Sequence, residues 1–490
     1  MSNTHVLGLD LGTSGVKAVL LDEAGRLRAE ATAPLQVQRP QAGWSEQDPS
    51  AWLAAADDAV RQLMRRADPA DWRAVQALAV AGQMHGAVLL DAAGAVLRPA
   101  ILWNDGRSQA QCEALERRVP EGRRIAANRA MAGFTAPKLL WVAEHEPELF
   151  ARVAKVLLPK DWLAWQLSGE MGTDTSDASG TWWLDVAGRR WSETLLDATG
   201  LGTGHMPELH EGPDAIGWLR ADWCQAWGLP ARVRIAAGAG DNAAGALGVG
   251  AVQPGDGFVS LGTSGVLFVT TDGPRPNPAR GVHSFCHALP GTWHQMAVLL
   301  SGAASLAWFA ALTGAREADL LAPLTGAPRA EAPLFLPYLS GERTPHADPG
   351  ARGSFINLQA GSTRDDLAHA VIEGVAFAFA DGLDALAEAG PVPSQLLAIG
   401  GGARSDAWLQ LLADVLQRPV LRAAGADVGP ALGAARLAQL ALGMDRAQVL
   451  RAPPTDRAFL PVADHQPVLA ERLARFRRAY APLRALAGQP

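Results

Sequence analysis

Several classes of protein are excluded by what this sequence lacks. Only three of its 490 residues are cysteine, and they form no CxxC pair. Any disulfide scheme leaves one of Cys112, Cys224 and Cys286 unpaired. We therefore expect reduced cysteines in the core, rather than the disulfide framework of a small secreted protein.

A strong charge of one sign is also missing. The formal net charge is −7 and the basic residues are scattered, so no patch for nucleic acid or for an anionic membrane is expected. The start of the chain, MSNTHVLGLD, lacks the basic region and apolar core of a secretory signal, which makes the cytoplasm the expected location. The apolar stretch 296–315 is broken by glycine, serine and threonine, and predicts a buried turn and helix rather than a membrane span.

Two common nucleotide-binding signatures are absent as well. The chain contains no GxxxxGK(S/T), and no GxGxxG follows a predicted strand, so a P-loop is excluded and a dinucleotide site is unsupported. The composition is that of a globular protein, with 48% hydrophobic and 19% charged residues. A chain of 490 residues is too long to fold around a single hydrophobic core, so its length predicts two domains.

What the sequence does contain is a duplicated hexapeptide. LGTSGV occurs at residues 11–16 and again at 261–266, each time between two apolar runs, which predicts two β-hairpins with glycine turns. Glycine can adopt positive φ, so such a turn brings backbone N–H groups and the threonine and serine hydroxyls close to an anion. We expect both hairpins to grip one polyphosphate.

The two copies differ in the residue that precedes them, Asp10 in the first and Ser260 in the second. A carboxylate on one side can organise magnesium, whereas a second one would add negative charge beside the phosphates. The alternative for Asp10 is a carboxylate that only caps the turn.

The remaining pattern alternates strands with helices and predicts an α/β fold of two similar halves, divided near residues 250–257. Asp48 and Pro49 predict the start of an amphipathic helix. RIAAGAGDNAAGALGVG reads as a strand, a glycine turn and a helix that begins at Asp241, where the helix N-terminus would keep the carboxylate ionised at pH 7. The alternative for Asp241 is an ordinary N-cap.

Two further segments favour structural interpretations. In HSFCH, His283 and His287 lie on one face of a predicted strand and Cys286 on the other, with no fourth ligand nearby, so a zinc site is disfavoured. The chain from 463 to 486 is predicted to be helical, and its arginines between Arg472 and Arg484 are interpreted as a solvated face rather than an RNA-binding patch.

The motifs LDLGTSGVK, AGQMHGAVLLD, GFTAPKLLWV, GDNAAGALGVG, SLGTSGV and FLPYLSGERTPH resemble those of the FGGY carbohydrate kinases, over nearly the whole chain. The resemblance implies two similar actin/hexokinase-like ATPase domains of the ribonuclease H-like type with a cleft between them. We expect the N-terminal domain to span residues 1–248 and the C-terminal domain 249–490. One departure is Asn357, where the family pattern has glycine; asparagine tolerates left-handed angles, so the turn should survive.

The resemblance also implies the residue roles in Mg-ATP-dependent sugar phosphorylation. Asp241 is the expected general base, and Asp10 together with Asp241 is expected at the magnesium ion. The expected ATP contacts are Gly12, Thr13, Ser14, Lys17, Gly262, Thr263, Ser264, Gly302, Gly401, Gly402 and Ser405. For Lys17 a solvated strand position is the alternative.

Substrate choice is expected to depend on the loop QMHG. Met84 offers an apolar wall and His85 a hydrogen-bonding group, a combination that suits a ketopentose, and the similarity is greatest to members that act on D-xylulose. The expected substrate-binding residues are Met84, His85, Asp241, Asn242, Trp103 and Asp105. Asn242, Trp103 and Asp105 are, together with Asn104, lesser candidates for the pocket wall.

The expected partners are a small sugar and ATP, with no nucleic acid and no membrane, and a homodimer is one of the assemblies that the sequence allows. Two alternatives stay open: a family kinase for another ketose or polyol, and a non-catalytic actin-like ATP-binding protein. The presence of Asp10, Asp241 and an intact QMHG loop favours a ketopentose kinase.

Overall fold

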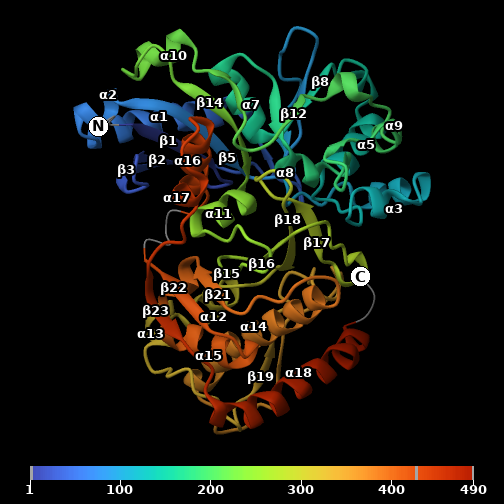
Figure 1. The fold of residues 1–490 in the computed structure, drawn as a ribbon. Coiled ribbons are helices and arrows are strands. Elements are labelled where there is room, and N and C mark those ends of the chain that lie inside the picture. The colour runs from blue at the N-terminus through green and yellow to red at the C-terminus, as the bar shows by residue number, and fades with distance from the viewer. Residues whose placement is uncertain (1–3, 425–428, 488–490) are drawn as a thin grey trace.

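The computed structural model describes residues 4–424 and 429–487, which form two halves, each built on a mixed β-sheet (Figure 1). The first sheet has the order β13 (Ala215–Trp218), β14 (Arg234–Gly240), β5 (Val75–Gly82), β1 (His5–Leu11), β2 (Gly15–Asp22) and β3 (Leu27–Pro34). β1 pairs antiparallel with β2, which pairs antiparallel with β3. On its other side β1 runs parallel to β5, which runs parallel to β14.

The second sheet repeats this arrangement. Its order is β17 (His283–Cys286), β18 (Trp293–Leu299), β16 (Gly265–Thr271), β15 (Gly257–Leu261), β21 (Leu396–Ile399), β22 (Val420–Ala423) and β23 (Thr455–Phe459). β15 is antiparallel to β16 and parallel to β21, which is parallel to β22. The predicted α/β fold of two similar halves is therefore confirmed.

Both copies of LGTSGV form the predicted hairpins, but in different registers. In the first, Leu11 pairs with Val16, and Gly12 N donates to Gly15 O at 3.0 Å, so the turn itself holds two residues. In the second, Leu261 pairs with Gly265, which leaves three residues in the turn. The Gly262 and Thr263 carbonyls of that turn accept bonds from the N–H groups of residues 302–304, so its shape depends on a distant segment.

Helices cover the faces of the sheets. α1 (Pro49–Arg66) begins as predicted, because Asp48 accepts a bond from Ser50 N at 2.9 Å, and it buries Trp52, Val60 and Leu63. The other helices of the first half are α2 (Pro69–Arg73), α3 (Gln109–Arg118), α4 (Gly122–Ile125), α5 (Thr135–His145), α6 (Pro147–Phe150), α7 (Pro159–Ser168), α8 (Thr175–Ala178), α9 (Glu193–Asp197), α10 (Ala221–Ala226) and α11 (Asp241–Val249).

The later part of the chain contributes α12 (Ala304–Thr313), α13 (Glu317–Leu321), α14 (Arg364–Ala387), α15 (Asp406–Leu416), α16 (Gly429–Ala441), α17 (Arg446–Val449) and α18 (Gln466–Leu486). Short strands complete the fold: β4 (Glu46–Gln47), β6 (Val88–Leu90), β7 (Ala100–Ile101), β8 (Lys155–Leu157), β9 (Gly172–Asp174), β10 (Leu184–Asp185), β11 (Arg190–Trp191), β12 (Glu208–His210), β19 (Leu334–Leu336) and β20 (Ser354–Ile356).

One helix of the later chain packs on the first sheet. α16 lies beside β1, β5 and α11, and its alanines share one core with Val6, Ala77 and Leu247 (Figure 1). The helices approach so closely that a Cβ atom on Gly433 would overlap the carbonyl oxygen of Ala244. The two halves are therefore joined by a helix crossing as well as by the chain connection.

The cysteines, the turn at Asn357 and the apolar stretch 296–315 were each given an expected structure. The three cysteines are free and buried, as predicted. Asn357 has a φ of 62°, so the expected left-handed turn is present. Stretch 296–315 begins as the end of β18 and continues into a turn and helix α12, which is buried on one side only, because Trp308 and Leu312 are exposed. Within the described residues, no helix is both long and apolar enough to cross a membrane.

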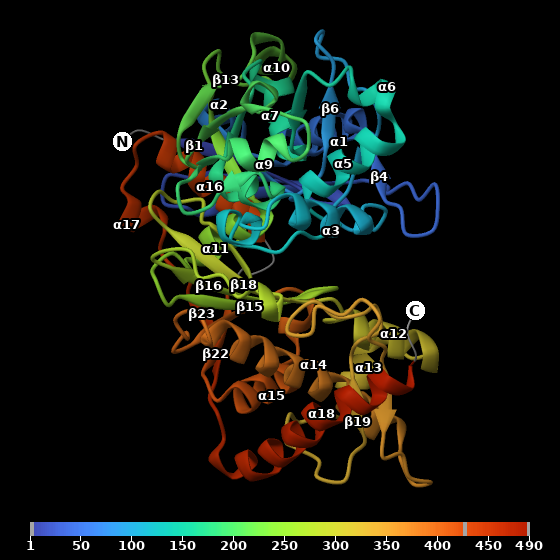
Figure 2. The same ribbon diagram turned by 90° about the vertical axis from the view of Figure 1, so that its right-hand side faces the viewer.

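The interpretation of the C-terminal arginines as a solvated face holds for Arg475, Arg477 and Arg478, which are exposed, but is wrong for Arg472. α18 packs beside α14 (Figure 2), and Arg472 is only 3% exposed. Its guanidinium forms a bidentate ion pair with Glu373 of α14, with Nε to Oε1 at 2.8 Å and Nη2 to Oε2 at 2.5 Å, and donates to the carbonyls of Ala330, Ala332 and Pro333. Arg477 and Arg484 also form ion pairs with acidic residues outside α18. Arg475 instead pairs with Glu471 of its own helix.

We predict that Arg472→Met lowers the free energy of unfolding by about 3–5 kcal/mol, because it leaves the buried Glu373 carboxylate without its cation. The matched control on the same helix is Arg475→Ala, which removes an exposed pair with Glu471 and should cost at most about 1 kcal/mol. Urea unfolding followed by circular dichroism measures both. Equal losses in the two variants would contradict the central role of the Arg472 pair.

Candidate active site

Two cavities meet at the turn of the second hairpin. The larger has a volume of about 770 Å³ and is lined only by residues between 261 and 408, so it belongs to the second half. The smaller has a volume of about 240 Å³ and is lined by residues of both halves. Gly262 borders both cavities, which places the hairpin turn between them.

The smaller cavity brings together most of the residues expected at the sugar. Met84 and His85 follow β5, Trp103 follows β7, and Asp241 and Asn242 begin α11. Gly262 and Ser264 of the second hairpin complete the predicted members of its wall. Parallel strands present their carboxyl ends at one edge of a sheet, and β5 and β14 therefore deliver Met84 and Asp241 to the same place.

The larger cavity contains the expected glycine turns of the second half. Gly262, Thr263, Gly401, Gly402 and Ser405 line it, together with apolar residues such as Leu306 and Trp408. Gly302 lies beneath the second hairpin, where its N–H donates to Thr263 O at 3.0 Å and a Cβ atom would clash with the hairpin backbone. A wall of this composition suits a flat apolar group with a polar tail.

The first hairpin is tied into the protein by its own side chains. Thr13 Oγ1 donates to Gln83 Oε1 and accepts from Trp103 Nε1, both at 3.0 Å. Lys17 Nζ forms an ion pair with Glu30 at 3.0 Å. Among the described residues, those that line the two cavities do not include Asp10, Gly12, Thr13, Ser14 or Lys17.

Asp10 and Asp241 are half-buried carboxylates whose like charges repel each other. Burial and the charge of Asp241 raise the pKa of Asp10 to about 7, while Lys17 lowers it. Burial raises the pKa of Asp241 to about 6, opposed by bonds from Asn242 N at 2.7 Å and Asn242 Nδ2 at 2.8 Å. Burial therefore outweighs the helix N-terminus and raises the pKa, but a pKa of about 6 still leaves the Asp241 carboxylate mostly ionised at pH 7, as expected.

The residues fit a hydrated divalent cation better than a directly coordinated one. Oδ1 of Asp10 is buried and has no hydrogen-bond partner within the described part of the chain, and a cation nearby would relieve its repulsion with Asp241. No group of three or more histidine, cysteine or acidic residues in the described chain could hold a metal ion. Magnesium keeps most of its water and needs few carboxylates, so two are sufficient.

His85 is held in one orientation. Its φ of 71° lies in the left-handed region, which residues other than glycine rarely adopt. The ring Nδ1 donates to Gly180 O at 2.8 Å, and the His85 carbonyl accepts from the buried Lys138 Nζ at 2.8 Å. Burial and the charge of Lys138 lower the pKa of His85 to about 3, so the ring is neutral and its Nε2 is an acceptor.

Asp105 lies at a neighbouring cavity of about 260 Å³, which it shares with Trp103 and Asn104. Its carboxylate accepts from Ser45 N at 2.6 Å and forms an ion pair with Arg107 Nη2 at 2.7 Å. Asp105 thus holds the loop that carries Trp103, and its oxygens already have protein partners.

Several residues of the smaller cavity were not predicted as site residues: Ser260, Val266, His283, Phe285, Met296, Val298 and Arg343. His283 and Arg343 are joined by a 3.1 Å bond between Nη1 and Nε2. Arg343 lies in FLPYLSGERTPH, one of the motifs that carry the resemblance, whereas HSFCH with His283 was interpreted as structural; single residues of the second half gave no signal that they reach the sugar loop. Next to Arg343, Glu342 is buried and burial raises its pKa to about 8.

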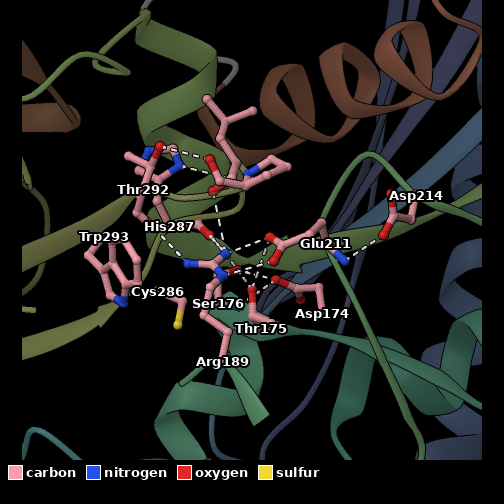
Figure 3. Close-up of polar contacts among 12 residues, drawn as sticks. Asp174, Thr175, Ser176, Arg189, Glu211, Asp214, Cys286, His287, Thr292 and Trp293 are labelled. Carbon is pink, nitrogen blue, oxygen red and sulfur yellow. Dashed lines mark hydrogen bonds and ion pairs between the residues drawn. The ribbon is translucent and has the colours of Figure 1, made fainter. Parts of the chain in front are cut away.

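A polar bridge joins the two halves beside the site (Figure 3). Arg189 of the first half binds Glu211 and Thr175, and it donates to Thr292 O at 2.8 Å and His287 O at 3.2 Å next to β17 and β18. Thr175 begins α8, in which Ser176 Oγ accepts from Gly240 N at 3.2 Å. The bridge is thus connected to the residue that precedes Asp241.

Comparison with known proteins shows which family this chain belongs to. The model of the FGGY family of carbohydrate kinases, N-terminal domain, matches residues 5–248, and that of the C-terminal domain matches residues 257–442. The chain is 50% identical over 481 residues to a xylulose kinase of Escherichia coli (strain K12), covering 97% of this chain and 99% of the relative. It is 49% identical to a xylulose kinase of Klebsiella pneumoniae over 459 residues, covering 93% and 94%.

A solved structure agrees with these matches. The crystal structure described as a xyloylose kinase from Brucella ovis superimposes with a TM-score of 0.95 at 48% identity, covering 98% of this chain and all of that chain. The expected fold of two actin/hexokinase-like domains is therefore confirmed.

The raised pKa of Glu342 predicts a pH-dependent stability. A carboxyl group whose pKa rises from 4.5 to about 8 on folding binds its proton more tightly in the folded chain, so stability falls as the pH rises through that window. We expect Glu342→Gln to increase the free energy of unfolding at pH 8 by up to about 5 kcal/mol, at about 1.4 kcal/mol per pKa unit. At pH 4 the variant and the wild type should be alike. Urea unfolding at both pH values measures this, and an equal difference at pH 4 and pH 8 would contradict it.

Proposed function

The chain belongs to the FGGY family of carbohydrate kinases, and from that premise we propose that it transfers the γ-phosphoryl group of ATP to D-xylulose, giving D-xylulose 5-phosphate. The observation that carries this proposal is the 240 Å³ cavity. Met84, His85 and Asp241 of one half line it together with Gly262 of the other half, which lies in the hairpin turn expected to bind phosphate. Near-complete coverage at 50% identity to a xylulose kinase supports the choice of sugar.

In this proposal Asp241 is the general base. It lines the cavity at the first turn of α11, and Asn242 holds one of its oxygens through two hydrogen bonds. A pKa of about 6 leaves the carboxylate mostly ionised at neutral pH yet basic enough to accept a proton. Because the transition state for phosphoryl transfer is loose, Asp241 mainly orients the C5 hydroxyl towards the phosphorus atom.

ATP would occupy the larger cavity, with its phosphates directed towards Gly262. We assign the adenosine to the surroundings of Gly401, Gly402 and Ser405, and the phosphates to Gly262, Thr263 and Ser264, with Gly302 supporting that turn from below. The first hairpin, with Gly12, Thr13, Ser14 and Lys17, is assigned to the opposite side of the β- and γ-phosphates. The ion pair of Lys17 with Glu30 would then be exchanged for one with phosphate.

Asp10, with Asp241 nearby, is assigned to magnesium through bound water. When bound, magnesium neutralises charge on the β- and γ-phosphates. Asp10 contributes an oriented carboxylate whose Oδ1 has no partner within the described chain.

Met84, His85, Trp103 and Asn242 are assigned to the sugar. The neutral His85 presents an acceptor for a sugar hydroxyl, and Asp105 supports the loop of Trp103. We further propose the domain division at residues 248 and 249, while the cytoplasmic location and a homodimer stay predictions.

The proposal is tested by incubating the protein with Mg-ATP and a panel of ketoses, aldoses and polyols, and measuring ADP release for each. We expect the largest kcat/KM with D-xylulose. A larger value with another ketose or polyol would identify a different family kinase, and no acceptor-dependent release would indicate a non-catalytic ATP-binding protein.

In the same assay we predict that Asp241→Ala lowers turnover of D-xylulose by about 10²- to 10⁴-fold, the usual range for a general base, with ATP binding retained. The matched control is Asp222→Ala, an exposed acidic residue in the first turn of α10, which should leave turnover unchanged. Retention of more than about a tenth of wild-type turnover by Asp241→Ala would contradict the assignment.

We also predict that the sugar draws the two halves together, since the smaller cavity has walls from both and closure excludes the water that competes for the phosphoryl group. Small-angle scattering should give a smaller radius of gyration with D-xylulose plus a non-hydrolysable ATP analogue than with the analogue alone. An unchanged radius would mean that the cleft is preformed.

A further inference from the structure

Arg343 is a cation in the wall of the smaller cavity, and the acidic residue whose charge acts on it is its chain neighbour Glu342. It follows β19 in the second half and borders both the 240 Å³ cavity and the neighbouring 260 Å³ cavity. Across the described chain, Arg343 forms no ion pair, and its guanidinium has a single hydrogen-bond partner, Nε2 of His283 at 3.1 Å. A guanidinium has five N–H donors, so four remain for a ligand.

The backbone of this segment is firmly held. Glu342 Oε1 accepts from Leu300 N at 2.9 Å and from Arg343 N at 2.7 Å. Thr344 Oγ1 donates to Gly281 O at 2.9 Å, and Thr344 N donates to Val298 O at 3.1 Å. Because the pKa of Glu342 is raised to about 8, its carboxyl group is mostly protonated at neutral pH and leaves the charge of Arg343 uncompensated.

The partner of Arg343 is fixed as well. Since Arg343 can only donate, His283 accepts at Nε2, and its Nδ1 donates to Asn128 Oδ1 at 3.0 Å. Asn128 Nδ2 donates to Ser284 O at 2.8 Å and to Ala126 O at 3.0 Å, which sets the direction of its amide. A chain of defined donors and acceptors therefore orients one edge of the guanidinium.

Arg343 lies on the His85 side of the cavity. Phe134 contacts both His85, with ring centroids 4.8 Å apart, and His283, at 5.6 Å. The positive charge of Arg343 contributes to lowering the pKa of both histidines, whereas burial and Asn242 determine the pKa of Asp241. Arg343 is thus on the side of the two histidines, in the wall of the cavity that Asp241 also lines.

The chemistry of the acceptor indicates what Arg343 meets. A 2-ketopentose closes its five-membered ring through O5, so only the open-chain form has a free C5 hydroxyl to phosphorylate. That form has a carbonyl at C2, three carbons from the reacting end. A carbonyl oxygen only accepts hydrogen bonds, and a guanidinium only donates them, so the two groups are complementary.

We propose that Arg343 is a specificity-determining residue that binds the C2 carbonyl oxygen of the open-chain ketose, at the end of the acceptor opposite the hydroxyl oriented by Asp241. The inference rests on the proposed function, because it requires transfer to O5. It explains why a half-buried arginine with a single hydrogen-bond partner stands in the sugar cavity. It also favours ketoses over polyols, whose C2 hydroxyl proton needs an acceptor that Arg343 cannot provide.

The kinetic test uses Arg343→Met and Arg343→Lys, with Arg129→Met as the matched control, since Arg129 lines the neighbouring 260 Å³ cavity and not the smaller one. Arg343→Met should lower kcat/KM for D-xylulose by about 10- to 100-fold, the effect of losing a hydrogen bond to a charged group. The loss should fall mainly on KM, because the contact exists before the transition state. Arg343→Lys should lose less, and Arg129→Met should match the wild type.

A direct test follows the carbonyl itself by ¹³C NMR of D-xylulose labelled at C2, bound to protein with ADP. We expect the bound wild-type resonance in the ketone region and downfield of free ketone, because a charged donor polarises the carbonyl. In Arg343→Met the downfield displacement should disappear, and in Arg343→Lys it should be reduced. Thermal unfolding shows whether each variant is folded. If Arg343→Met does not fold, the Arg343→Lys variant provides the test.

The outcomes separate the inference from the function on which it rests. A wild-type protein without xylulose-dependent ADP release would refute the proposed function. An active wild type whose bound sugar has a hemiketal resonance, or the same carbonyl resonance in Arg343→Met, would overturn the role of Arg343. A fall in kcat alone, with the carbonyl resonance unchanged, would also overturn it and indicate an action of Arg343 on the phosphoryl group.

Discussion

The approach of α11 and α16 is the constraint on which the site depends. α11 begins at Asp241, and α16 comes from the later part of the chain but packs on the first sheet. Gly433 lies so close to the carbonyl of Ala244, and Gly248 to Gly429, that any side chain would separate the helices. The position of the proposed base is therefore set by contacts from both halves, and movement of one half relative to the other must pivot at this crossing.

A second constraint is electrostatic. Lys160 lies behind the site within 4 Å of three carboxylates, those of Asp161, Asp174 and Asp177. Asp174 binds Ser176, whose hydroxyl accepts from Gly240 N, so this network reaches the backbone next to Asp241. Burial raises the pKa of Asp161 and, more strongly, that of Asp177, so the ionised form of these groups is disfavoured in the folded chain.

The sequence was sufficient for features that depend on neighbouring residues. The cap at Asp48, both hairpins and the start of α11 at Asp241 follow from short-range rules of capping and turn formation, and the structure has them. The burial of Arg472 and the place of Arg343 in the cavity depend on residues far away in the chain, including Glu373 and His283. Local pattern predicts a solvated Arg472 and gives no site role to Arg343, because only tertiary packing supplies the partner in each case.

The two copies of the duplicated hexapeptide are identical in sequence but not equivalent in structure. Identical letters close a two-residue turn in one copy and a three-residue turn in the other, because the second turn is captured by residues 302–304. A displacement of one position turns strand side chains to the opposite face of a sheet. An alignment of the two halves that follows the identical residues would therefore exchange core and solvent positions along a strand. A hairpin moved from one half to the other would take its conformation from its new neighbours.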